Sequence, residues 1–328
     1  MKKCAWLVFL TVGLITCGKK DPAPQKAQCL LTGYSNSGSF TTGAAYTYTG
    51  TQTITYNSQN LIAGSDNTTL EQFANGNKVT TSAKRTYEYD ANGFMTSQTD
   101  QFSSDAGGSF LSTDTYNYEY ANNLLTKSTH NNTTLNTGVT SSYTTTEIYQ
   151  YNNAGKIVQM SSTTSGTAGN TSFSILYEYT NGVLSKITED DGGGPSSGEV
   201  EVNAQGLITK IVYPTSENHY QYNEEGNLLK LESWQSNKKT STITYEYDTN
   251  PGVSRLIFPP QKGLSQINLY GNTNTHNITK LTQYDGSDVI TNQAVYTYTY
   301  NSHGYPTTES YTSAGAQSTS TFSYKDCD

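Results

Sequence analysis

Residues 194–198 read Gly-Pro-Ser-Ser-Gly and have the Gly-x-Ser-x-Gly spacing of a nucleophile elbow, in which a serine attacks an acyl group. An elbow needs a strand before the serine and a helix after it, because the sharp turn between them exposes the hydroxyl. The next four residues, 199–202, alternate acidic and apolar side chains, which is typical of a strand. We therefore interpret the segment as a Gly/Ser hairpin loop and not as a hydrolase site.

Carboxylates and imidazoles could hold a metal. Glu189, Asp190 and Asp191 precede Gly192, but they lack the alternating acids and the distant Glu of a calcium loop, which favours a solvated acidic turn. None of the histidines has a second His or Cys at a ligand spacing, so the sequence supports no zinc site. The sequence also contains no Walker loop and no Rossmann glycine set. The four histidines are His130, His219, His276 and His303. We predict no catalytic residue, no metal and no cofactor.

The composition limits the class of protein that must position any such residues. The chain has 328 residues, a formal charge of −8 and only 14% charged residues, which disfavours a nucleic-acid-binding surface. Leu, Ile, Val and Phe together number 56, or about 17%, which is below the roughly one-fifth under which a chain tends to be disordered. Tyr adds 27 residues. Either the chain is disordered or tyrosine builds much of its packing.

The N-terminus has the pattern of an export signal. Lys2 and Lys3 precede an apolar run over residues 5–15, which is too short to span a membrane as a helix. The sequence Leu-Ile-Thr-Cys at residues 14–17 resembles the lipobox of bacterial lipoproteins. That resemblance implies a signal peptide over 1–16, a lipidated Cys17 and a flexible tether over 17–28; an ordinary secretory signal is the alternative.

The residues after Cys17 also resemble a known tether. The sequence Gly-Lys-Lys-Asp at 18–21 is similar to the start of Bacteroidota lipoproteins, in which Lys followed by an acid accompanies display on the cell surface. The resemblance implies a protein of the outer membrane, anchored by lipid and facing the cell surface. In an exported protein Cys29 and Cys327 can form a disulfide, with two free thiols as the alternative.

An internal repeat fills most of the expected domain, residues 29–328. Its clearest copies, at 87–95, 149–158 and 220–229, share Tyr-x-Tyr, then Asn or Asp, then Gly three residues later, then an apolar pair or residue. Asn60 stands at the Gly position of the first copy. The second aromatic position falls at Tyr56, Tyr89, Tyr120, Tyr151, Tyr179, Tyr222, Tyr247 and Tyr300, with Val202 in one copy, and the turn glycines are Gly93, Gly155, Gly182, Gly206, Gly226 and Gly304.

Each part of the repeat has a physical role. Tyr-x-Tyr places two rings on one face of a strand, because side chains alternate with a period of two. Asn or Asp followed three residues later by Gly predicts a tight turn with a positive φ and a hairpin with a bulge. About ten hairpins predict an all-β fold, an antiparallel meander of roughly twenty strands in a long curled or partly closed sheet. The Thr/Ser runs at 161–171 and 312–321 are interpreted as loops or as strand extensions.

The unit Tyr-x-Tyr-Asp-x-x-Gly-x-hydrophobic resembles the YD repeat of the RHS family and of teneurin shells. Residues 87–95 are the closest copy, and the resemblance covers about 54–324. The Arg that often follows the Gly in that family is absent from these copies. RHS proteins are much longer and build a closed shell around a C-terminal toxin, whereas here no toxin domain follows the last repeat. The resemblance implies a β scaffold and no activity.

Together these patterns predict a non-catalytic, lipid-anchored cell-envelope repeat protein that acts as a surface binding or structural scaffold. Expected partners are the membrane, through the N-terminal lipid, and a glycan or an envelope or host protein, but no nucleic acid. A glycan-binding accessory lipoprotein of a polysaccharide-handling system and an enzyme of unrecognised type are the alternatives. A membrane-spanning barrel is disfavoured, since most strands lack Leu, Val and Phe on either face. Trp234 is interpreted as either a core or a contact residue.

Overall fold

The computed structural model describes residues 29–41, 45–106, 110–253 and 275–327. The predicted signal peptide and tether, with Cys17, lie outside the described residues. The described chain is built from strands: β1 (Leu30–Phe40), β2 (Tyr46–Tyr56), β3 (Ile62–Phe73), β4 (Lys78–Tyr89), β5 (Met95–Ser104), β6 (Phe110–Ala121), β7 (Leu124–Asn136), β8 (Val139–Tyr151), β9 (Ile157–Gly166), β10 (Gly169–Thr180), β11 (Val183–Asp190), β12 (Ser196–Val202), β13 (Ile208–Val212), β14 (Ser216–Tyr222), β15 (Leu228–Gln235), β16 (Lys238–Pro251), β17 (His276–Asp285), β18 (Ile290–Tyr300), β19 (Pro306–Ser313) and β20 (Ala316–Lys325).

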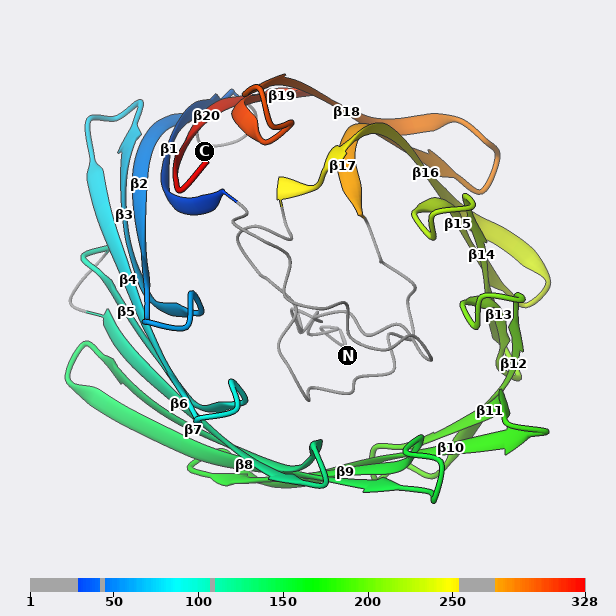
Figure 1. Ribbon diagram of the computed structural model, residues 1–328. Coiled ribbons are helices and arrows are strands. Elements are labelled where there is room, and N and C mark those ends of the chain that lie inside the picture. Colours follow the sequence, from blue (N-terminus) through cyan, green and yellow to red (C-terminus); the bar gives the residue numbers. More distant parts are fainter. Residues whose placement is uncertain (1–28, 42–44, 107–109, 254–274, 328) are drawn as a thin grey trace.

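The sheet closes on itself. Every strand pairs antiparallel with the next, and β1 pairs with β20 from Leu30 opposite Lys325 to Phe40 opposite Ala316, so that twenty strands form one ring (Figure 1). The all-β meander is confirmed, but the expected curled or partly closed sheet is wrong. The missed element is β1, which carries no copy of the repeat. Its pairing with β20 satisfies the backbone groups of both edges, which would otherwise attract other chains.

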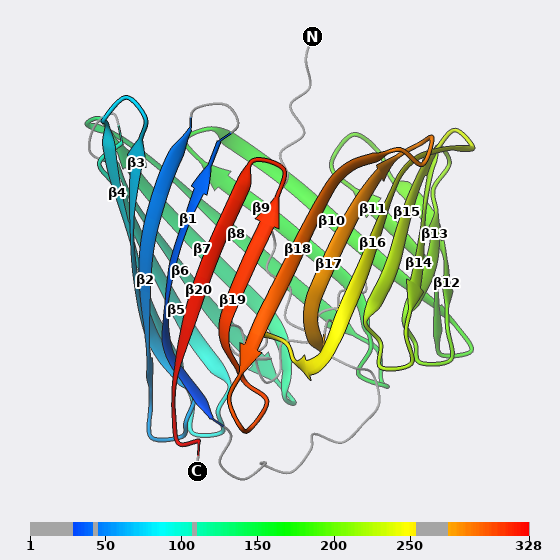
Figure 2. The ribbon, with the colours of Figure 1, turned by 90° about the horizontal axis from the view of Figure 1, so that it is seen from above.

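The two ends of the barrel differ. One end, which we call the turn end, carries the Asn/Asp turns of the repeat together with Cys29 and Cys327. The other end, the loop end, carries the alternate connections, among them residues 74–77 and 236–237. The strands run steeply between the two ends with a common tilt (Figure 2), which closure of a barrel requires. The Thr/Ser runs at 161–171 and 312–321 are strand extensions that reach toward the loop end.

The repeat turns are held by their own side chains. In the turn after β12, Oδ1 of Asn203 accepts hydrogen bonds from the backbone N–H groups of Gln205 and Leu207, at 3.0 Å each. Gly206 follows with φ 82°, a conformation that residues with a Cβ avoid. Asn60, at the Gly position of the first copy, has φ 59°. The other predicted turn glycines, Gly93, Gly155, Gly182, Gly226 and Gly304, also have a positive φ.

A bulge accompanies these turns. In the β4–β5 hairpin the pairing shifts between Glu88 and Tyr89, because Tyr89 pairs with Met95 while Glu88 pairs with Ser97. The same shift precedes the second aromatic position of the other repeat hairpins. A bulge strengthens the local twist. The extra residue lies in the strand after the turn, here Thr96 of β5, so Met95 shares the inner face with Tyr89 while Ser97 faces outward.

The apolar core is concentrated near the turn end. One buried cluster spans β9 to β15 and includes Ile187 and Ile211. A second lies on β1, β2, β3 and β20 and includes Leu31 and Phe322. Tyrosines pack against both clusters, as the composition requires. Leu228 is buried, whereas the adjacent Leu229 is exposed, so the apolar pair after the turn is covered on one side only.

A disulfide joins the first and last strands of the barrel at the turn end. Cys29 and Cys327 are bonded across the β1–β20 seam, with their Cα atoms 4.4 Å apart, and 298 residues separate them in sequence. The side-chain amide of Asn301 lies 3.9 Å from both sulfurs. Within the described ranges no helix is long and apolar enough to cross a membrane.

Candidate functional site

The inner face of the barrel is the candidate functional surface. Arg85, Tyr87 and Tyr89 of β4 are half-buried, while the residues between them are exposed. The concave side of a closed sheet crowds its side chains, so the less exposed set faces inward. Val253 confirms this assignment, because it follows β16 yet packs against the buried cluster that contains Leu31. β16 has no sheet neighbour in that cluster, so this contact must cross the interior, toward which the end of β16 points in Figure 1.

Tyrosine hydroxyls join neighbouring hairpins at the turn end. The hydroxyl of Tyr151 in β8 donates to the carbonyl oxygen of Leu125 in β7, at 2.8 Å. Leu125 lies two residues beyond Lys127, where the β7–β8 ladder ends, so it has no paired residue in β8. We call this set the tyrosine ladder; its other members are Tyr56 to Leu31, Tyr89 to Ile62, Tyr179 to Ile157, Tyr222 to Ile208, Tyr247 to Leu228, Tyr298 to Ile278 and Tyr324 to Pro306.

Two predicted members of the ladder depart from it. The buried hydroxyl of Tyr120 has no hydrogen-bond partner among the described residues. Tyr300 donates to Asp248, and its neighbour Tyr298 takes the Ile278 carbonyl instead. The reason is local: the connection between β16 and β17 spans residues 252–275 and replaces the short turn, so Asp248 bonds Asn277 across it. The repeat does not predict Tyr298 as a ladder member, because Tyr298 is the first tyrosine of its Tyr-x-Tyr unit and the prediction used the second.

Burial controls the ionisation of the ladder. Desolvation raises the pKa of Tyr151 to about 12. It also raises the pKa of Tyr56, Tyr222, Tyr247 and Tyr324, in the last two cases with a contribution from neighbouring tyrosines. The phenols therefore stay neutral and keep their donor protons at physiological pH.

A polar network lines the inner face of β4 to β8. Arg85 Nε lies 3.2 Å from Asp100 Oδ2, and Gln98 donates to the same carboxylate at 2.9 Å. Burial raises the pKa of Asp100, while Arg85 lowers it. One hairpin further, Glu147 accepts from Ser128 at 2.8 Å and from Tyr149 at 2.6 Å. These acids are thus partnered in the wall.

The centre of this network is a histidine–aspartate pair. His130 Nε2 lies 2.7 Å from Asp114 Oδ1, and Asn132, which is buried, donates to the same oxygen at 2.8 Å. Tyr116 stacks on the imidazole with ring centroids 4.2 Å apart, and Tyr143 meets it edge-on at 5.3 Å. Such a pair could orient a general base. Ser112, however, contacts Asp114 and not the imidazole, so the described residues supply no nucleophile to it.

His130 is isolated in the sequence but paired in the fold. The pair arises from strand register, which places Tyr116 opposite His130 and Asp114 opposite Asn132. Pairing residues of the two strands outward from the Asn122-Asn123 turn, with one bulge, predicts that Asp114 and His130 lie close together. Among the described residues no group of three His, Cys, Asp or Glu could hold a metal ion.

The two faces of the barrel carry opposite chemistry. On the outer face lysines pair with acids of neighbouring strands, as in Lys210–Glu217 at 3.1 Å and Lys186–Glu178 at 3.3 Å. Away from the hairpin tips, strand register places two basic residues on the described inner face, Arg85 and His130. Away from the same tips, the carboxylates of that face are Glu71, Asp100, Asp114, Glu147, Glu189 and Glu309.

No protein-family model matches the chain, and no curated protein matches it. Among solved structures, the chain is similar to a porin-like protein from Bacteroides uniformis, with 16% identity, a TM-score of 0.36 and coverage of 90% of this chain and 96% of that one. A porin-like protein from Bacteroides vulgatus has 9% identity and a TM-score of 0.34, covering 91% and 99%. A TcdB2–TccC3–TEV structure has 11% identity and a TM-score of 0.28; the match covers 82% of this chain but 15% of that one.

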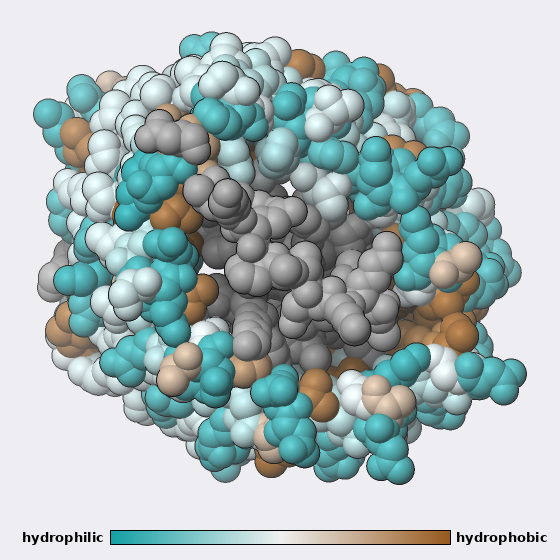
Figure 3. All heavy atoms as spheres, viewed as in Figure 1, coloured by the Kyte–Doolittle hydropathy of each residue, from teal (hydrophilic) through white to brown (hydrophobic). Residues whose placement is uncertain are grey.

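Trp234 lies on the outer face. It pairs with Glu217, stacks on His219 with centroids 5.8 Å apart, and its indole N–H is buried without a partner in the described structure. Thr242, two strand positions away on the same face, is also buried with an unpartnered hydroxyl. Trp234 is therefore a packed residue of the outer surface and lies outside the core. Viewed along the barrel axis in Figure 3, hydrophilic residues form most of the rim.

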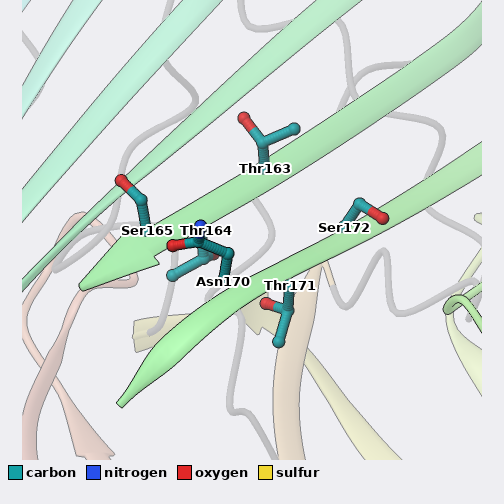
Figure 4. A pocket seen from close by; sticks show the side chains of 6 residues that line it. All are labelled: Thr163, Thr164, Ser165, Asn170, Thr171 and Ser172. Carbon is teal, nitrogen blue, oxygen red and sulfur yellow. The ribbon is translucent and has the colours of Figure 1, made fainter. Parts of the chain in front are cut away.

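A shallow groove of about 380 Å³ lies at the tip of the β9–β10 hairpin. Figure 4 shows its lining, which consists of hydroxyl and amide side chains from both strands. Thr164 is already bonded to Thr145 at 2.8 Å. Without a titratable or aromatic group in its lining, the groove is a poor candidate for chemistry; its residues are Thr163, Thr164, Ser165, Asn170, Thr171 and Ser172.

Proposed function

We propose that the protein is a non-catalytic scaffold of the cell envelope, anchored in the outer membrane through lipid on Cys17 and facing the cell surface, whose barrel binds a ligand on its inner wall. The observation that carries the proposal is the segregation of chemistry between the two faces. Paired lysines and acids lie outside among exposed aliphatic side chains, whereas aromatic rings and carboxylates with few basic residues lie inside.

The outer face suits water. Lys127 lies 2.7 Å from Glu119 near the turn end. Lys84 of β4 is exposed opposite Asp66 in the middle part of the barrel wall. A barrel that faces lipid presents an apolar band there, and a lysine at that depth costs about 2–4 kcal/mol. We infer that the barrel stands in water and that the lipid on Cys17 holds it to the membrane.

The inner wall suits binding. Barrels of sixteen or more strands enclose more space than their own side chains fill, so a twenty-strand wall can receive a ligand. Its tyrosines offer flat apolar faces together with polar tips, a combination enriched at interfaces. Its His130–Asp114 pair is locked between two tyrosine rings and lacks a nucleophile among the described residues, which favours binding over catalysis.

A glycan-binding accessory role is the second candidate. It is favoured by inner tyrosines whose hydroxyls are unpaired within the described part of the chain, Tyr46 and Tyr48, since such groups can bond sugar hydroxyls while the rings contact sugar faces.

Membrane extraction of the full-length protein tests the proposal. The wild type is expected to need detergent for release, whereas Cys17→Ser is expected to appear in the detergent-free fraction with its barrel intact by circular dichroism. A Cys17→Ser protein that is folded and still needs detergent would show that the outer face contacts lipid. Protease treatment of intact cells should then remove the wild-type barrel; protection until the outer membrane is opened would contradict surface display.

A further inference from the structure

An aromatic patch lies on the inner face at the loop end of β1, β2 and β3. Strand register places Tyr46 between Phe40 and Phe73, and Tyr48 opposite Glu71. Ring centroids are 4.8 Å apart for Phe40 and Tyr46 and 5.4 Å apart for Tyr46 and Phe73. We call these five residues the rim patch. We propose that the rim patch binds an organic cation, an ammonium or guanidinium group; this inference rests on the proposed use of the inner wall for binding.

The rim patch has no structural task comparable with that of the tyrosine ladder. Its rings belong to neither buried cluster, because both clusters lie near the turn end. The hydroxyls of Tyr46 and Tyr48 make no hydrogen bond within the described ranges, whereas each ladder tyrosine bonds a backbone carbonyl. All four rings are only half-buried. The patch therefore presents aromatic surface and free polar groups to the interior.

Glu71 differs from the other carboxylates of the inner face. Asp100 has Arg85, Asp114 has His130, Glu147 has Tyr149, and burial raises the pKa of Glu189 and Glu309 beside Tyr213 and Tyr298. Glu71 makes no hydrogen bond or ion pair in the described structure, yet it faces inward opposite Tyr48. It is the carboxylate of this wall whose charge is available to a ligand.

Charge complementarity favours a cation over other ligands. A concave wall lined by one sign of charge concentrates the opposite charge, and this wall carries six acids against one arginine and one histidine. Aromatic faces add cation–π attraction for an ammonium or guanidinium group. The chain already uses this contact at the turn end, where Lys156 Nζ lies 5.3 Å from the Tyr179 ring and Lys325 Nζ lies 5.2 Å from the Tyr56 ring.

Gly38 fixes the position of one ring. A Cβ on Gly38 would lie 2.7 Å from Cε1 of Tyr48, so the absence of a side chain lets the ring pack against the β1 backbone. The patch is thus held in place before a ligand arrives, which reduces the entropy lost on binding.

Calorimetric titration with a lysine hexapeptide tests the proposal on the full-length protein. We expect binding that weakens with salt, and binding at least tenfold weaker to the N-acetylated, uncharged peptide. Glu71→Gln should weaken binding about tenfold, and Tyr46→Ala several-fold. The matched control is Glu119→Gln, which removes the same charge from the outer face and should leave binding unchanged. Tyr46→Phe keeps the ring and should also leave it unchanged.

Four results would overturn the proposal. Equal loss in Glu71→Gln and Glu119→Gln would mean that the peptide responds to net charge and not to the rim patch. Equal binding of the acetylated peptide would exclude a cation-specific site. Binding of neutral oligosaccharides without binding of the hexapeptide would refute the cation site while leaving the inner wall as a binding surface, whereas no binding of either probe would contradict both proposals. Circular dichroism of each variant shows that folding is retained.

Discussion

At eight places around the barrel, a tyrosine hydroxyl donates a hydrogen bond to a backbone carbonyl of the neighbouring hairpin. Tyr151 illustrates it: the β7–β8 ladder ends at Lys127, and the Tyr151 hydroxyl bonds the carbonyl of Leu125, which has no paired residue in β8. A buried carbonyl without a partner destabilises the fold, so the hydroxyl stabilises each junction between hairpins. Tyrosine therefore provides both apolar area and a hydrogen bond in a chain that is poor in Leu, Ile, Val and Phe.

Tyr151→Phe is expected to lower the free energy of unfolding by about 1–3 kcal/mol, because the Leu125 carbonyl loses its donor. Tyr120→Phe is the matched control. The hydroxyl of Tyr120 is buried without a partner among the described residues, so its removal should be neutral or stabilising. Urea denaturation followed by circular dichroism measures both. Equal destabilisation by the two changes would show that the ladder bonds do not matter.

The pH dependence of stability is also set at single tyrosines. The pKa of Tyr151 is about 12 in the folded chain, against about 10 when unfolded. Above pH 10 the unfolded state loses this proton first, so stability is constant below about pH 10 and falls as pH rises toward 12. Urea midpoints measured at successive pH values, with tyrosinate absorbance recorded in parallel, check this. Stability that rises above pH 10 would contradict buried, neutral phenols.

The hairpin is the next scale, and its turns depend on local sequence. Asn203 bonds the N–H groups of residues two and four positions later, and Gly206 supplies the positive φ. All these interactions lie within five residues. For that reason the turns and most ladder positions could be predicted from sequence. Tyr298 and Tyr300 exchanged roles only where the 252–275 connection replaced such a turn.

Gly206→Ala should lower the free energy of unfolding by about 1–2 kcal/mol through backbone strain alone, because no atom lies within 4 Å of the Cβ position. Gly206→Asn should cost clearly less, since Asn60 already adopts φ 59° at the equivalent place. Thermal denaturation of the two variants beside the wild type measures the difference. If Ala and Asn were equally tolerated, the strain explanation would fail.

At the scale of the whole molecule, closure is the feature that local sequence does not encode. β1 lacks the repeat, and its pairing with β20 joins residues almost 300 positions apart. The same limit applies to the candidate site. The Asp114–His130 pair depends on register across a hairpin, and the rim patch brings together residues from three strands. The sequence contains the side chains, but only the pairing shows which of them meet.

Removal of the seam disulfide is expected to destabilise the whole barrel. On the loop-entropy model a bridge that closes a loop of this length stabilises by roughly 5 kcal/mol. Cys29→Ser with Cys327→Ser should therefore lower the urea midpoint strongly without altering the spectrum of the folded state. A double variant as stable as the wild type would show that β1–β20 pairing closes the barrel unaided.

The central claim is that one face of this sheet meets water while the other lines an enclosed, ligand-binding interior. Adjacent residues of β3 test it most directly: Thr68 is exposed on the outer face, and Thr69 is half-buried on the inner face. Thr68→Cys and Thr69→Cys are treated, without detergent, with a small maleimide and with a maleimide attached to a large polymer. The chain without the introduced cysteine is the control for background labelling. We expect Thr68→Cys to react with both reagents. Thr69→Cys should react with the small maleimide but far more slowly with the polymer. Equal polymer reactivity at the two positions would contradict it.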